Sequence, residues 1–360
     1  MRKLRGFAVF LFVFGMAISL FEKQIISGNA VGSNFLRGFP FLGVFLMVFS
    51  AILFFVESLS YRSKIGKGGL DGLLEEIVRG DSVVIFDTSA FLDLLGANKG
   101  GVDKASLKKV MNYFQSSKSR QFYLTLGVYA EILQRKENRG WANQIYGMPN
   151  FSTISPEGMK LSDLMNFAGA YRNSRENLED ALDSSLRIPR KVFNVAWQYM
   201  KLTPKAQMAY VISKFLKGGD FSKDLEATGG LNEKFLKDEL KKISWRSHYV
   251  FKDEWFENPE KIPRDLRENI LRELKSHYAP SKTDTEIVAG AIYMALCGKK
   301  VRVTSGDSDL GEVIGYLEYG VDGVDVETGK RVHLNAMFPD NNSSKRISFV
   351  NTKKMRNWGV

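Results

Sequence analysis

The sequence predicts an α/β protein in which a parallel sheet is covered by helices on both faces. The first predicted strand, Val83–Phe86, is a short run of apolar residues only, as expected for a strand buried on both faces. Strand-like runs alternate with helical patterns from about Asp81 to Gly140 and again from about Ser281. Between these parts the pattern is helical, and two long apolar segments precede them. We therefore expect a membrane part, a split sheet domain and a helical insertion.

Residues 1–60 are expected to form a transmembrane hairpin of two helices. Gly6 to Phe21 is sixteen residues without a charge, and Phe39 to Val56 is eighteen. At about 1.5 Å per residue they span roughly 24 and 27 Å, close to a hydrocarbon core of about 30 Å. Basic residues flank the outer ends of both spans, which predicts that both ends face the cytoplasm. The alternative is a cleaved signal peptide that ends near Ala30. Residues 61–80 are expected to be a juxtamembrane linker.

The first part of the sheet domain is expected at residues 81–139. A basic amphipathic helix from Lys104 to Gln115 follows the first strand, and Gln121 to Leu126 is the second predicted strand. A helix that carries Glu131 comes next.

Residues 140–280 are expected to be an all-helical insertion. The best defined of its helices has Thr203 as N-cap, Pro204 in the first turn and Gly218 beyond its end. The net charge of the insertion is only +3, from 22 basic and 19 acidic residues, which favours a structural or protein-binding role. Aromatic residues from Trp245 to Phe256 are expected to form the core of the insertion rather than a surface for base stacking.

The second part of the sheet domain is expected at residues 281–335, followed by a basic tail at 336–360. Thr283 to Glu286 matches a capping box at the start of a long apolar helix. Lys300 to Thr304 is a predicted strand, and Gly323 to Glu327 and Arg331 to Met337 are expected to be terminal strands.

Charge and cysteine content restrict the chemistry. The formal net charge is +11, and Lys99 to Arg139 holds nine basic residues against three acidic ones, which suits a polyanionic substrate. The basic tail suits either nucleic acid or anionic lipid headgroups. The single cysteine, Cys297, excludes a disulfide framework and indicates a reducing compartment. With three scattered histidines, a structural zinc site is not expected, so oxygen ligands would hold any metal, as suits Mg²⁺ or Mn²⁺.

Four carboxylates lie just past predicted strands or in the helices that follow them: Asp87, Glu131, Asp284 and Asp307. In an open parallel sheet the carboxyl ends of the strands share one edge, where ligands bind. Each acid has a simpler explanation alone, as a helix cap, a surface glutamate or a polar turn. Four together would repel one another unless cations neutralised them. The sequence therefore predicts a site for hard metal ions at this edge.

The motifs around these acids resemble those of the PIN-domain family of metal-dependent nucleases. The resemblance covers about a third of the chain and rests on Val83-Val84-Ile85-Phe86-Asp87-Thr88-Ser89, Glu131-Ile132-Leu133, Asp284-Thr285-Glu286-Ile287-Val288-Ala289 and Val303-Thr304-Ser305-Gly306-Asp307-Ser308-Asp309-Leu310. It implies a PIN-like sandwich of a central parallel sheet between helices.

By this resemblance, the metal ligands would be Asp87, Glu131, Asp284 and Asp307, with Asp309 as a possible fifth acid. Ser89, Thr304 and Ser305 are candidates to orient a metal-binding carboxylate or a phosphate by a hydrogen bond, without binding the metal themselves. The sequence departs from the family pattern in two ways. The insertion makes the separation between Glu131 and Asp284 long, and Gly306 adds a residue before Asp307, which leaves the choice between Asp307 and Asp309 open.

The expected function is that of a membrane-anchored endonuclease that uses Mg²⁺ or Mn²⁺, with its catalytic domain in the cytoplasm. The family resemblance favours RNA over DNA as substrate. A second hypothesis is a non-catalytic membrane adaptor that binds a protein partner through the insertion. A third is a metal-dependent DNA nuclease that acts on flaps or branched structures.

Overall fold

The computed structural model describes residues 70–95, 102–117, 121–134, 138–167, 175–219, 232–246, 248–339 and 345–353, together with residues 225 and 228. The chain divides into two compact units, Met1–Gly72 and Leu73–Val360. The expected hairpin at residues 1–60 and residues 61–69 of the expected linker lie outside the described residues. The linker prediction was wrong for the rest, because Leu70–Val78 forms the helix α3, in which Leu73, Leu74 and Ile77 are buried. In the ranges that are described, no helix has the length and apolar character needed to cross a membrane.

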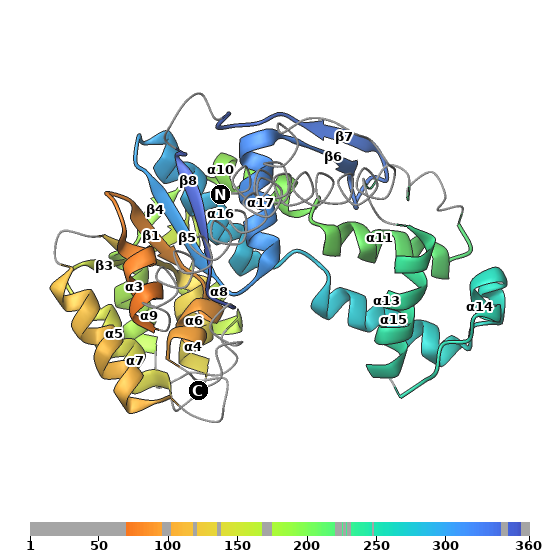
Figure 1. The fold of residues 1–360 in the computed structure, drawn as a ribbon, viewed down its shortest axis with the longest axis horizontal. Helices are drawn as coiled ribbons and strands as arrows, with labels where there is room; N and C mark the ends of the chain where they lie inside the picture. The colour runs from red at the N-terminus through yellow and green to blue at the C-terminus, as the bar shows by residue number, and fades with distance from the viewer. Residues whose placement is uncertain are drawn as a thin grey trace, which may run out of the picture. The chain divides into compact units, whose positions relative to one another are not determined.

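A parallel six-stranded sheet forms the centre of the second unit (Figure 1). Its strand order is β4-β3-β2-β1-β5-β8, and each neighbouring pair is parallel. The strands are β1 Val83–Phe86, β2 Phe122–Thr125, β3 Phe151–Pro156, β4 Leu186–Ile188, β5 Val301–Ser305 and β8 Ile347–Asn351. In the register, Phe86 lies beside Leu124 of β2 and Thr304 of β5, so these three strands end at the same edge. The prediction of an α/β fold with a central parallel sheet is confirmed.

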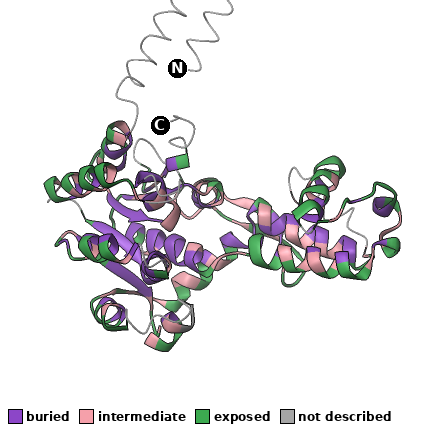
Figure 2. Cartoon of the chain, turned by 90° about the horizontal axis from the view of Figure 1, so that it is seen from below, coloured by how far each residue is buried: buried purple, intermediate pink, exposed green. Residues whose placement is uncertain are grey.

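Helices flank this sheet. In Figure 2 the strands of the sheet are largely purple, the colour of buried residues. The flanking helices are α3 Leu70–Val78, α4 Thr88–Leu94, α5 Lys104–Ser116, α6 Leu126–Gln134, α7 Arg139–Tyr146, α8 Leu161–Phe167, α9 Arg175–Asp183, α10 Arg190–Met200, α16 Lys282–Leu296 and α17 Ser308–Tyr319.

The two faces of the sheet are packed differently. On one face, the ring of Phe86 lies 4.7 Å from that of Phe91 in α4 and 5.5 Å from that of Phe114 in α5, between centroids. On the other face, α16 lies close to the strands at Gly290, where an added Cβ would stand 2.3 Å from Cδ1 of Ile154. The absence of a side chain at position 290 therefore allows this helix to contact the sheet directly, and α16 carries Asp284 in its first turn.

The prediction of an all-helical insertion was wrong over its first part, because β3 and β4 extend the sheet. The strand β3 was missed because it has hydroxyl residues where the other strands have apolar ones. The Thr153 hydroxyl donates to the Ala181 carbonyl at 2.7 Å and that of Ser155 lies 2.7 Å from the Ser185 hydroxyl, so both polar groups are satisfied inside the protein. The strand β4 has only three residues and follows directly on α9.

The later part of the insertion is helical and has a core of its own (Figure 1). Its helices are α11 Pro204–Leu216, α13 Glu233–Arg246, α14 Glu254–Glu257, the 3₁₀ helix η5 Pro259–Lys261 and α15 Arg264–His277. The expected cap is confirmed, since the Thr203 side chain accepts a hydrogen bond from Ala206 N. Phe251, Trp255 and Phe256 are buried as expected, whereas Trp245 is 76% exposed.

The end of the chain differs from the expectation in two places. The predicted terminal strands form a separate antiparallel pair, β6 Val321–Val324 and β7 Arg331–Leu334. The predicted basic tail contains β8, which joins the main sheet beside β5. The apolar pattern of β8 is interrupted by Ser348 and Asn351, so the strand was not recognised from the sequence.

Candidate acidic site at the carboxyl ends of the strands

Asp87 follows β1 and is held by hydroxyl groups from two segments. It is the N-cap of α4 and accepts a hydrogen bond from Ser89 N at 3.3 Å. Its Oδ2 also accepts from the hydroxyl of Ser305, at 2.7 Å, and from the Ser89 hydroxyl. The side chain is only 6% exposed. Burial raises the pKa of Asp87, while the hydrogen bonds from Ser89 and Ser305 act in the opposite direction.

Glu131 is oriented by two threonines. The hydroxyl of Thr88, the residue after Asp87, donates to Oε2 at 2.5 Å, and the hydroxyl of Thr283 donates to Oε1 at 2.8 Å. Burial raises the pKa of Glu131, the two hydroxyls lower it, and the charge of Asp87 raises it further. Both carboxylate oxygens are therefore fixed by segments that also position Asp87 and Asp284.

Asp284 lies in the first turn of α16, whose N-cap is Ser281. Its carboxylate is half-buried, and among the described residues it accepts no hydrogen bond and forms no ion pair. Burial, together with the charges of Asp87, Asp307, Glu131 and Asp309, raises the pKa of Asp284 to about 8. Four other carboxylates thus act on an acid that no described side chain neutralises.

Asp307 and Asp309 lie at the start of α17, directly after β5. Asp307 is the N-cap and accepts a hydrogen bond from Asp309 N at 3.0 Å. Both face the ammonium group of Lys205, whose Nζ is 2.6 Å from Asp309 Oδ2 and 3.3 Å from Asp307 Oδ1. Burial raises the pKa of Asp309, which the bond to Lys205 counteracts. The same cation thus contacts both Asp307 and Asp309, the two acids between which the sequence left the choice open.

Gly306 has no side chain, which lets its backbone lie close to the side chains of Ser89 and Asp93. Its N–H donates to the Ser89 hydroxyl at 2.8 Å, and a Cβ at this position would lie 2.6 Å from Asp93 Oδ2. The next residue, Asp307, donates its N–H to the Ser305 hydroxyl at 2.8 Å. The extra residue in the fourth motif therefore links β5 to the loop that carries Asp87.

The structure places the four predicted acids at one edge of the sheet, coupled through their charges and through Ser and Thr hydroxyls. As they stand, however, no three His, Cys, Asp or Glu side chains of the described residues form a group that could hold a metal ion. The donor set suits a hard cation, because it consists of carboxylate and hydroxyl oxygens. The unneutralised Asp284 carboxylate adds an electrostatic reason for a cation to bind there.

The supporting residues agree in part with the expectations. Ser89 and Ser305 both contact Asp87, whereas the buried hydroxyl of Thr304 has no hydrogen-bond partner among the described residues. The capping box at Thr283 to Glu286 was wrong, because Ser281 caps α16 and Glu286 instead accepts a hydrogen bond from Gly127 N in α6, at 3.1 Å. This hydrogen bond connects α16 to α6. Burial raises the pKa of Glu286 to about 7.

Three contributors were missed by sequence reasoning: Thr88, Thr283 and Lys205. Thr88 and Thr283 adjoin predicted acids, so a search for hydroxyl residues beside each acid could have found them. Lys205 lies 102 residues from Asp307 in the chain, within the predicted insertion, and no motif marks it.

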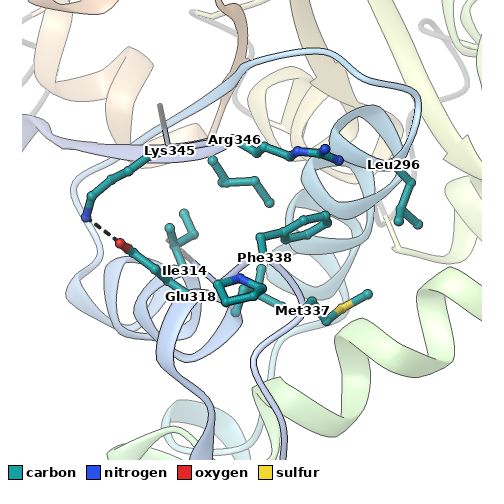
Figure 3. A pocket seen from close by; sticks show the side chains of 10 residues that line it. Leu296, Ile314, Glu318, Met337, Phe338, Lys345 and Arg346 are labelled. Atoms are coloured by element: carbon teal, nitrogen blue, oxygen red, sulfur yellow. Dashed lines mark hydrogen bonds and ion pairs between the residues drawn. The ribbon is translucent and has the colours of Figure 1, made fainter. Parts of the chain in front are cut away.

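A separate cavity of about 440 Å³ lies at the other end of α17 (Figure 3). It is lined by Ile314, Phe338 and Arg346 among others, and an ion pair of 2.9 Å between Lys345 and Glu318 crosses its edge. Because Asp307 and Asp309 are at the first turn of the same helix, this cavity is not part of the acidic site.

In comparisons with known proteins, no family model, no curated protein and no solved structure matches this chain. The resemblance to the PIN-domain family consequently rests on the sequence motifs alone.

Proposed function

We propose that this protein is a metal-dependent nuclease that hydrolyses phosphodiester bonds, with RNA as the favoured substrate. The observation that carries the proposal is Asp284, a half-buried carboxylate that lacks a counter-charge among the described residues and lies within the field of Asp87, Glu131 and Asp307. In its fully ionised form, a cluster of this kind is electrostatically unfavourable unless a cation binds to it, and without a cation Asp284 keeps its proton up to about pH 8. An unfavourable electrostatic free energy at a partly exposed group of acids is typical of a functional site rather than of a scaffold.

Asp87, Glu131, Asp284 and Asp307 would hold Mg²⁺ or Mn²⁺, with Asp309 as a possible further ligand. When bound, such an ion activates water and stabilises the leaving oxygen of a phosphodiester. Ser89 and Ser305 orient the Asp87 carboxylate, and Thr88 and Thr283 orient that of Glu131. These hydroxyls hold the ligand oxygens in place before the ion arrives, as partners of metal ligands commonly do.

Basic residues on a helix that packs against α4 support a polyanionic substrate. The helix α5 exposes Lys104, Lys108 and Lys109 and packs on α4, the helix that Asp87 caps. Positive charge of this kind raises the local concentration of a nucleic acid around an acidic centre. The preference for RNA over DNA comes from the family resemblance alone.

The test is a cleavage assay with the full-length protein, purified in detergent, on single-stranded RNA, single-stranded DNA and flap DNA. We expect Mn²⁺-dependent cleavage that EDTA abolishes and that Asp87→Asn reduces by at least about a hundredfold, since loss of one metal ligand disrupts the site. Asp238→Asn, which changes an exposed aspartate of α13, is the matched control and should keep full activity. Full activity of Asp87→Asn would refute the assignment, and cleavage of flap DNA alone would favour the DNA-nuclease hypothesis.

A specific contact favours the second candidate function, a non-catalytic adaptor. Lys205 neutralises two of the acids from a helix of the predicted insertion, and a protein that needs no metal could be stabilised in this way. The insertion also has its own core and exposes Trp245, which a protein partner could cover. Absence of cleavage on all three substrates, with a folded protein, would support the adaptor.

We also propose that residues 6–21 and 39–56 anchor the protein in a membrane with the acidic site in the cytoplasm. Support comes from their uncharged composition and from the basic residues that flank them. Carbonate extraction of membranes should leave the protein in the pellet. In intact cells, external protease should not cleave the second unit, and release of the protein by carbonate would contradict the anchor.

A further inference from the structure

Lys205 is brought into the acidic site by a part of the chain that does not belong to the strand-end motifs. It is the second residue of α11, and the Nζ atom lies 2.6 Å from Asp309 Oδ2, 3.3 Å from Asp307 Oδ1 and 3.4 Å from Asp307 Oδ2. A single ammonium group thus contacts three carboxylate oxygens of two aspartates. The Lys205 side chain is 43% exposed and that of Asp309 is 16% exposed, so the contact lies at the mouth of the site rather than in the core.

The start of α11 is held firmly. Thr203 caps the helix, and the Gln207 side-chain amide exchanges hydrogen bonds with the backbone of Val324 in β6, of 2.7 Å to its carbonyl and 2.9 Å from its N–H. Just before the helix, the buried Lys201 pairs with Asp325 at 2.9 Å. The position of Lys205 therefore follows from contacts made on both sides of it, and does not depend on the two aspartates alone.

The charges around Lys205 resemble those of a cation position in a metal site. In two-metal nucleases, neighbouring divalent ions lie roughly 3.5–4 Å apart and share carboxylate ligands. Here the acids differ in their counter-charges. Asp307 and Asp309 already have a cation, whereas Asp284 has none among the described residues and lies in the field of Asp87, Asp307, Glu131 and Asp309.

We propose that the Lys205 ammonium group serves as a built-in cation on the Asp307–Asp309 side, so that the site binds one divalent ion, beside Asp87, Glu131 and Asp284, instead of two. This inference rests on the proposed metal-dependent function and concerns how many ions the site takes. It changes the proposed ligand set, because Asp307 and Asp309 are then paired with Lys205 and the ion is held by Asp87, Glu131 and Asp284. Without Lys205, the two aspartates would face each other with no neighbouring cation, and a second divalent ion would bind there to offset their repulsion.

The experiment measures the number of bound Mn²⁺ ions, from the electron paramagnetic resonance signal of free Mn²⁺ during titration of the full-length protein in detergent. The wild type should bind one ion at the site and Lys205→Met should bind two. Lys205→Arg keeps the charge and should bind one. Lys217→Met, which removes an exposed lysine at the C-terminal end of the same helix, should also bind one. Circular dichroism checks that each variant is folded. If Lys205→Met does not fold, Lys205→Arg still tests the inference, because two bound ions in that variant would overturn it.

The outcomes separate the inference from the function on which it rests. Two ions in the wild type, or one in folded Lys205→Met, would overturn the inference and leave the metal site in place. Two ions in Lys205→Arg would overturn it as well, because the charge is retained. Failure of every variant to bind Mn²⁺ would refute the metal site itself, and the inference with it.

Discussion

Replacement of Asp284 by Asn should stabilise the metal-free protein at alkaline pH. The pKa of Asp284 is raised from its ordinary value of 3.8 to about 8, by burial and then by the charges of Asp87, Asp307, Glu131 and Asp309. Between these two pH values the native state binds a proton that the unfolded chain has lost. The free energy of unfolding therefore falls as the pH rises from about 4 to about 8, and the full destabilisation is present above pH 8.

The magnitude follows from the same pKa. At about 1.4 kcal/mol for each pKa unit, the difference between 3.8 and about 8 sets an upper limit of about 6 kcal/mol. Asp284 is half-buried, and solvent screens part of this interaction, so we expect a gain of about 1–3 kcal/mol from Asp284→Asn at pH 9. At pH 4 the difference between the two proteins should be under about 1 kcal/mol, because the carboxyl is protonated in the native wild type and only about half ionised in its unfolded chain.

The assay is urea unfolding of wild type and Asp284→Asn in EDTA, at pH 4, 7 and 9, followed by the same series in Mn²⁺. Bound metal stabilises only the folded protein that binds it, so Mn²⁺ should raise the unfolding midpoint of the wild type and not that of the mutant. A mutant that is less stable than the wild type at pH 9 in EDTA would refute the reasoning, because it would show that Asp284 makes favourable contacts as a carboxylate.

Two further substitutions test the support of the site and the fold behind it. Ser305→Ala removes the hydrogen bond of 2.7 Å to Asp87 and should lower the free energy of unfolding by about 1–3 kcal/mol, whereas Ser116→Ala, at the exposed end of α5, should change it by less than about 0.5 kcal/mol. Equal effects would show that Ser305 does not hold Asp87. Gly290→Ala would place a Cβ 2.3 Å from Ile154 Cδ1 and should cost about 1–3 kcal/mol. The control is Gly315→Ala in α17, where nothing lies within 4 Å, and we expect no loss there. Unchanged urea midpoints in Gly290→Ala would contradict the close contact of α16 with the sheet.

The strands that could be predicted from the sequence are those that consist mostly of consecutive apolar residues. The strands β1, β2 and β5 are buried at almost every residue and were recognised for that reason. The strand β3 contains three hydroxyl residues and β8 contains Ser348 and Asn351, so neither is a continuous apolar run, and β4 is too short to show a pattern. Their place in the sheet depends on hydrogen bonds such as that of Thr153 to Ala181, which only the folded chain brings together.

The candidate site divides in the same way. The acids could be predicted because each lies next to a recognisable strand or helix start, and parallel strands end at one edge. Their partners could not, because the contacts join segments far apart in the chain, as between Thr283 and Glu131, 152 residues apart. Glu286 shows the limit of local reasoning, since a sequence that matches a capping box instead bonds to Gly127 in another helix.

The most direct test is the position of a bound ion. Crystals of the protein soaked in Mn²⁺ should give one strong anomalous difference peak, about 2–2.5 Å from carboxylate oxygens of Asp87, Glu131 and Asp284. Crystals that are soaked at saturating Mn²⁺, with these side chains ordered and no peak between them, would contradict the claim that the strand-end acids form a metal centre.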